Sequence, residues 1–173
     1  MREDRTMSDS RLGGADEERT MLNGFLDWQR AVAERKVDGL SDADATRPMP
    51  PSGLSLLGII QHLGWAECLW FPFRLAGEDV DLDIKPGGGN DHTFLVAPDA
   101  TVESVLAYYR AQTERAREVV AGIPSLDQLA AREHSRYGRV TMRWVLLHLI
   151  EETARHNGHL DLMREAIDGR TGD

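Results

Sequence analysis

The chain has 173 residues, of which 41% are hydrophobic and 28% charged, a balance typical of one soluble globular domain with its own core. A formal net charge of −9, with basic residues interleaved with acids, argues against a nucleic-acid partner. No run approaches the roughly 20 apolar residues of a membrane span, and the single cysteine, Cys68, excludes an internal disulfide and indicates a reducing, cytoplasmic location.

The beginning of the chain is polar, contains glycine and lacks apolar periodicity, which predicts a disordered leader over residues 1–16. From residue 16 to residue 37 apolar side chains recur at spacings of three and four, as in an amphipathic helix. The segment 39–53 is rich in Asp, Ser and Pro, and its three prolines prevent a continuous helix. We expect the folded domain to span residues 17–169, with a short tail at 170–173.

The second predicted helix begins near Ser55, which is a suitable N-cap, and continues to Gly77. Pro72 should kink this helix or end its regular part, because proline cannot donate a backbone hydrogen bond. Residues 78–98 are predicted to form a long loop that contains a GGGN run. Loops of this length are usually functional or mobile.

A third helix is predicted from Thr101 to Ala121, with a threonine cap that is weaker than a true capping box. After a polar loop at 122–139, the last helix is predicted from Thr141 to Ile167, ending at Gly169. Four long amphipathic helices without strand alternation predict an all-α protein. The expected architecture is an antiparallel four-helix bundle with long inter-helix loops.

The last predicted helix presents metal-ligand side chains on one face. At about 100° per residue, a sector of about 80° contains His148, Glu152, His156 and His159. Glu152 and His156 are one turn apart and can bind one cation together. His62 interrupts an apolar run of the second helix, LLGIIQHLGW, and is the strongest candidate for a third ligand. Two histidines and one carboxylate leave coordination positions open, which is typical of catalytic metal sites.

Other interpretations of these residues remain open at this point. His62 alone could be a satisfied core histidine, and Glu152 could pair with an arginine of its own helix. His148 and His159 could orient a ligand, contact a substrate or line the cleft. Trp65 could pack in the bundle or line a substrate pocket. A helical interaction module without metal would surround His62 with apolar contacts and keep it away from Glu152.

The stretch TMRWVLLHLIEETARHNGHLDLMREAIDG, residues 141–169, resembles the signature of the DinB-like superfamily, and most closely a short actinobacterial branch of it. LLGIIQHLGWAECLWF, residues 56–71, resembles the segment with that family's first metal ligand. The resemblance covers residues 21–169. It implies a four-helix bundle that binds zinc, nickel or a similar divalent ion through three side chains. By position it assigns His62 and His156 as ligands, while Glu152 stands where a histidine is common.

The glutamate at position 152 resembles the mycothiol-dependent maleylpyruvate isomerase branch, whose metal ligands are two histidines and one glutamate. That isomerase has a further domain with substrate contacts, so its activity is not implied. The superfamily's characterised enzymes mostly transfer or activate low-molecular-weight thiols. The resemblance therefore implies a zinc-dependent thiol S-transferase or detoxification enzyme, with nickel as the alternative ion. It further implies mycothiol and a small electrophile as substrates, and a homodimer. The alternative is a non-catalytic metal-binding stress-response protein.

Overall fold

The computed structural model describes residues 17–82 and 91–172. The predicted leader at 1–16 and residues 83–90 of the predicted long loop lie outside the described residues. The helical elements, in chain order, are α1 (Glu18–Arg35), α2 (Asp42–Thr46), α3 (Leu56–Cys68), the π-helix η2 (Leu69–Ala76), the 3₁₀-helix η3 (Asp91–Phe94), α4 (Val102–Gly122) and α5 (Met142–Asp168). The described ranges contain isolated β-bridges but no strand, so the predicted all-α class is confirmed.

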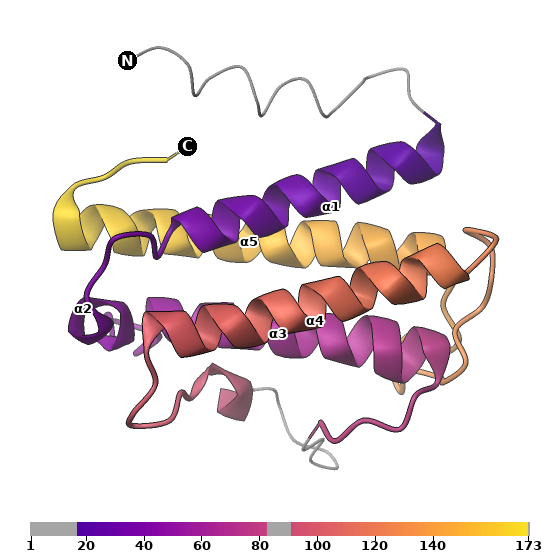
Figure 1. The fold of residues 1–173 in the computed structure, drawn as a ribbon, viewed down its shortest axis with the longest axis horizontal. Coiled ribbons are helices and arrows are strands. Elements are labelled where there is room, and N and C mark those ends of the chain that lie inside the picture. Colours follow the sequence, from indigo (N-terminus) through magenta and orange to yellow (C-terminus); the bar gives the residue numbers. More distant parts are fainter. Residues whose placement is uncertain (1–16, 83–90, 173) are drawn as a thin grey trace.

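The long helices pack as two pairs, α1 beside α5 and α3 beside α4 (Figure 1). The two helices of each pair run in the same direction, and the two pairs run in opposite directions. At one end Arg143 of α5 donates to Glu18 of α1, with Nε 2.7 Å from Oε1. At the other end Arg164 of α5 donates to the carbonyl of Asp38, just beyond α1, over 2.8 Å. The predicted antiparallel relation thus holds between the pairs, and α3 packs against α5 in that sense.

Several helix ends follow from local sequence signals. Ser55 caps α3, its hydroxyl accepting from the Gly58 N–H over 3.0 Å. Gly169 ends α5 at φ 76°, a left-handed conformation that glycine adopts without steric cost. The cap of α4 is stronger than predicted, because Thr101 and Ser104 exchange hydrogen bonds from each backbone N–H to the other's hydroxyl. Serine therefore completes a capping box in place of the usual glutamate.

The predicted second helix is divided into two parts. Its regular α-helical part ends at Cys68, four residues before Pro72, and the chain continues as the π-helix η2 to Gly77. Proline has no N–H for the carbonyl four residues earlier, which explains the change of helix type. Cys68 is buried, and burial raises the pKa of its thiol. The short helices α2 and η3 were not predicted.

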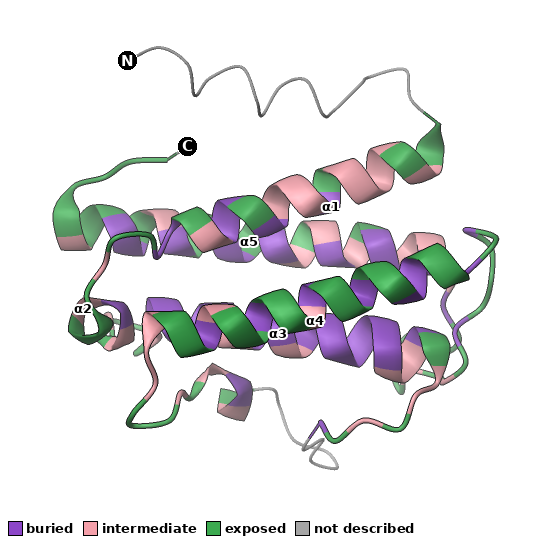
Figure 2. Cartoon of the chain, viewed as in Figure 1, coloured by how far each residue is buried: buried purple, intermediate pink, exposed green. Residues whose placement is uncertain are grey.

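The core fills the space between the helix pairs, where buried residues line the inward faces (Figure 2). One apolar cluster surrounds η2 and the first half of α5, and a second surrounds the first half of α3 and the ends of α1 and α5. A buried ion pair joins α1 to α3: Arg30 donates to Glu67 through Nε at 2.7 Å and through Nη2 at 2.6 Å. Among the described helices, none has the length and apolar character needed to cross a membrane.

Candidate metal centre

Three of the predicted site residues meet where α3 packs against α5. His62 comes from α3, and Glu152 and His156 lie one turn apart on α5. The Glu152 Oε1 atom is 3.3 Å from His62 Nε2 and 3.2 Å from His156 Nε2. Both histidines are buried, whereas the Glu152 side chain is 24% exposed. The centre is therefore set into the bundle and reaches its surface through the carboxylate.

The spacing of these side chains fits a metal ion. Zinc–nitrogen and zinc–oxygen bonds of about 2.1 Å at tetrahedral angles place neighbouring ligand atoms about 3.4 Å apart. The separations of 3.3 Å and 3.2 Å in the structure agree with that value. One potential ligand atom from each of the three residues lies within 4.8 Å of the others. His62, Glu152 and His156 could therefore hold a metal ion.

The protonation states also favour cation binding. Hydrogen bonds from His156 and His62 hold the pKa of Glu152 well below its usual range despite partial burial. Burial lowers the pKa of His62, although its hydrogen bond to Glu152 opposes that change. At neutral pH the centre therefore offers an ionised carboxylate and a neutral His62 imidazole, the forms that coordinate metals.

The far side of the His62 ring contacts η3. His62 Nδ1 lies 2.7 Å from the hydroxyl oxygen of Thr93. The Phe94 ring stacks on the imidazole with centroids 4.0 Å apart and planes 15° from parallel. Neither residue was identified from the sequence, in which only the length of the loop drew attention to this region. An interaction module without metal would surround His62 with apolar groups alone. The contact with the Thr93 hydroxyl shows that His62 is not enclosed in this way.

His148 and His159 take up different surroundings. The His148 ring lies 4.8 Å from the centroid of Trp70 and 4.9 Å from that of Trp144, within an aromatic cluster one turn before Glu152. His159 is exposed, with its ring centroid 5.4 Å from that of His156. Neither residue belongs to the group that could hold an ion. Their predicted supporting roles remain predictions.

Trp65 lies beside the centre, at the edge of a cavity. Its ring is 6.1 Å from the His62 ring, and its Nε1 donates to the carbonyl of Leu82 over 2.9 Å. The cavity has a volume of about 270 Å³ and is lined by Gln61, Trp65, Leu82, His92, Thr93 and Tyr108. Because Thr93 contacts both the cavity and His62, this space adjoins the possible ligand set.

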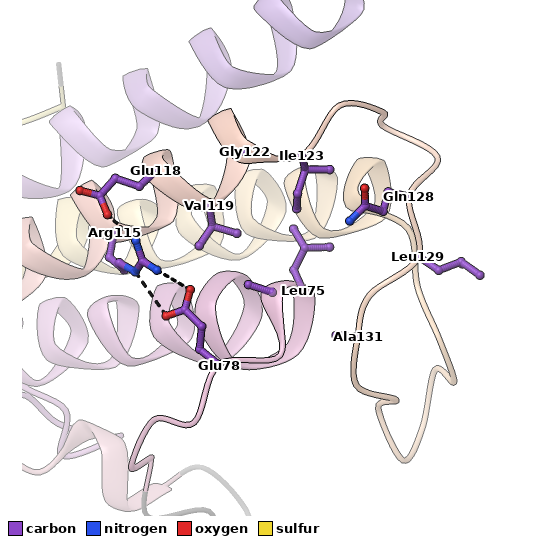
Figure 3. Close-up of a pocket in the computed structure, with 11 residues that line it drawn as sticks. Leu75, Glu78, Arg115, Glu118, Val119, Gly122, Ile123, Gln128, Leu129 and Ala131 are labelled. Carbon is purple, nitrogen blue, oxygen red and sulfur yellow. Dashed lines mark hydrogen bonds and ion pairs between the residues drawn. The ribbon is translucent and has the colours of Figure 1, made fainter.

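A larger cavity of about 380 Å³ lies elsewhere, where η2, α4 and the segment 123–131 meet (Figure 3). Arg115 lines it, and its guanidinium donates to Glu78 over 2.5 Å and also to Glu118. With two carboxylates already beside it, this arginine is a poor anion-binding group. None of the predicted site residues lines this cavity.

Comparison with known proteins identifies the family of the chain. The model of a family described as mycothiol-S-transferase matches residues 21–169. A search among curated proteins found no match. The matched range includes all three residues of the centre and agrees with the DinB-like resemblance of the sequence. The chain belongs to the mycothiol-S-transferase family.

Proposed function

We propose that this protein is a divalent-metal-dependent mycothiol S-transferase whose ion is held by His62, Glu152 and His156. The observation that supports this most directly is the spacing of the three side chains. Glu152 Oε1 lies within 3.3 Å of both His62 Nε2 and His156 Nε2, as ligands of one ion would. Membership of the family supports mycothiol as the thiol substrate.

The residues of the centre suit thiol activation. A divalent ion held there would lower the pKa of a thiol at its open positions, so that thiolate forms near neutral pH. Glu152 contributes a negative charge, so we expect a smaller lowering of the thiol pKa than three histidines would give. The thiolate sulfur supplies the electron pair of the new sulfur–carbon bond. The leaving group departs with the pair of the broken bond, and the thiol proton passes to solvent.

The cavity of about 270 Å³ beside His62 favours an enzyme over a closed metal store. Its lining combines aromatic rings, including Trp65 and Tyr108, with polar groups such as Gln61. Pockets with this combination accept small molecules that have both apolar and polar parts. We assign the cavity to the substrates, with Trp65 in contact with them and with His148 and His159 as supporting residues at the centre.

The remaining features of the proposal follow from the ligand types and the family. Two imidazoles and a carboxylate suit zinc, with nickel as the alternative ion. We propose a cytoplasmic homodimer in which residues 17–169 form the catalytic domain and residues 1–16 and 170–173 flank it. Metal analysis of protein purified without an affinity tag identifies the ion. Light scattering gives the oligomeric state.

The decisive experiment uses the protein loaded with cobalt. Adding mycothiol should produce a thiolate-to-cobalt charge-transfer band, and the band should be absent in His62→Ala. His156→Ala should lose stoichiometric metal, whereas His159→Ala, a matched histidine on the same helix, should keep it. The opposite result for these two variants would show that the ligand is His159. Full metal content without a band for mycothiol, bacillithiol or glutathione would favour the non-catalytic stress-response protein instead.

A further inference from the structure

The Nδ1 atom of His62, which faces away from Glu152, makes its hydrogen bond with η3. Nδ1 lies 2.7 Å from the Thr93 hydroxyl oxygen, and both residues are buried, with His62 4% exposed and Thr93 5% exposed. A buried hydrogen bond is shielded from competing water and fixes the orientation of the ring. This contact determines which way the Nε2 atom of His62 faces.

The η3 segment that contains Thr93 is held on α3 at several points. Gln61, the neighbour of His62, donates through Nε2 to the carbonyls of Thr93 at 3.1 Å and Leu95 at 2.7 Å. One turn earlier, a Cβ atom on Gly58 would lie only 2.3 Å from the Phe94 carbonyl oxygen. Glycine is therefore required for this close approach. The position of the Thr93 hydroxyl is fixed by α3 itself.

A hydroxyl group is well suited to this position because it can both donate and accept. A carboxylate only accepts, so in the structure the Nε2–H of His62 donates to Glu152 and leaves Nδ1 as an acceptor for the Thr93 hydroxyl. When Nε2 coordinates an ion, a neutral ring carries its proton on Nδ1 instead. The Thr93 oxygen then accepts that proton's hydrogen bond. A single side chain thus satisfies the buried nitrogen in both states.

We propose that Thr93 is a positioning residue that orients His62 for the metal and accepts the Nδ1 hydrogen bond when the ion is bound. The inference rests on the proposed metal site and goes beyond its three ligands. His156 provides the contrast within the site, since among the described residues its buried Nδ1 has no hydrogen-bond partner. The η3 segment is in this way part of the metal centre.

Zinc affinity measured by competition with a chelator on the full chain tests the proposal. Thr93→Val keeps the shape but removes the hydroxyl, and it should weaken zinc binding by about 10- to 100-fold, the usual loss for a group supporting a metal ligand. Thr93→Ser should retain the parent affinity. Thr113→Val is the control, because this buried threonine on α4 donates only to the Arg110 carbonyl of its own helix and should not alter affinity.

The outcomes separate this inference from the proposed function. If the parent protein binds no zinc, the metal site and the inference fail together. If the parent binds zinc and Thr93→Val binds it equally well, the inference alone fails. A measurement on the unaltered protein does not depend on the folding of any variant. Nitrogen-15 NMR of the His62 ring should show the proton on Nε2 without zinc and on Nδ1 with zinc, and an Nδ1 without a proton in the zinc-bound state would overturn the proposal.

Discussion

Replacing Glu67 by glutamine should destabilise the protein more than any conservative surface change. In the parent, Glu67 accepts two hydrogen bonds from Arg30, at 2.7 Å and 2.6 Å, and its side chain is 1% exposed. Burial disfavours the charge on Arg30, but the charges and hydrogen bonds of Glu67 and, to a smaller extent, Asp27 outweigh this effect and raise the arginine's pKa. Glutamine removes the negative charge and turns an N–H group toward the guanidinium.

The size of the effect follows from the burial of the pair. Removing one partner of a buried pair costs about 3–5 kcal/mol. Without Glu67 the buried Arg30 retains only Asp27, 2.9 Å away, whose side chain is 46% exposed and therefore compensates the charge less well. Domains of this kind have a free energy of unfolding of about 5–15 kcal/mol, so a large part of the stability would be lost. At roughly 2–4 °C for each kcal/mol in a chain of this size, the melting temperature should fall by about 6–20 °C.

Thermal and urea unfolding in the presence of a chelator would measure this change, since a bound ion would otherwise add stability. Glu34→Gln is the matched control, because its partner Arg110 has a side chain that is 60% exposed and such pairs contribute less than about 1 kcal/mol. The double variant Arg30→Met/Glu67→Leu should be more stable than Glu67→Gln. If Glu67→Gln proves no more destabilising than Glu34→Gln, the reasoning from burial is wrong.

Three further predictions concern the metal centre and the start of the chain. Gly58→Ala places its Cβ 2.3 Å from the Phe94 carbonyl oxygen, so both the melting temperature and the zinc affinity should fall. Gly122→Ala is the control and should lower neither, because its Cβ meets open space. The folded-state pKa of Glu152 is depressed, so its carboxylate stabilises the metal-free protein above the ordinary glutamate range, and this stabilisation is lost as the pH falls. In urea melts between about pH 6 and pH 3, Glu152→Gln should therefore lose less stability than the parent, and the exposed Glu151→Gln should behave like the parent. Deletion of residues 1–16, which lack apolar periodicity, should leave the melting temperature unchanged, and a large decrease would show that the leader packs on the domain.

The parts of the structure that depend on local sequence were predictable. Apolar periodicity located the four long helices, and Ser55 and Gly169 marked helix ends that the structure retains. The pairing of Glu152 with His156 is likewise local, since a spacing of four on one helix brings two side chains together. The sequence indicated His62 as a candidate ligand because a histidine interrupts an otherwise apolar run. Only the structure shows that its Nε2 atom lies 3.3 Å from Glu152 Oε1 on α5.

The remaining features arise from contacts between distant parts of the chain. Thr93 approaches His62 because α3 provides a glycine and a glutamine that fix η3, and no sequence pattern connects these positions. Arg30 lies in amphipathic sequence and Glu67 in a largely apolar helix, and only the packing of the whole bundle brings them together as a buried pair. The π-helical continuation of α3 was partly foreseeable from Pro72, but proline alone does not determine which irregular helix follows.

The position of the centre along the chain has a consequence for biosynthesis. His62 and Glu152 are 90 residues apart in the sequence, and Glu152 lies on the last helix, α5. At about 5–20 residues per second, a ribosome needs roughly 5–18 s to add the residues between them. During that interval the growing chain contains His62 but not its carboxylate partner. A nascent chain therefore cannot assemble the three possible ligands until α5 has been synthesised, and products truncated before α5 would contain none of them except His62.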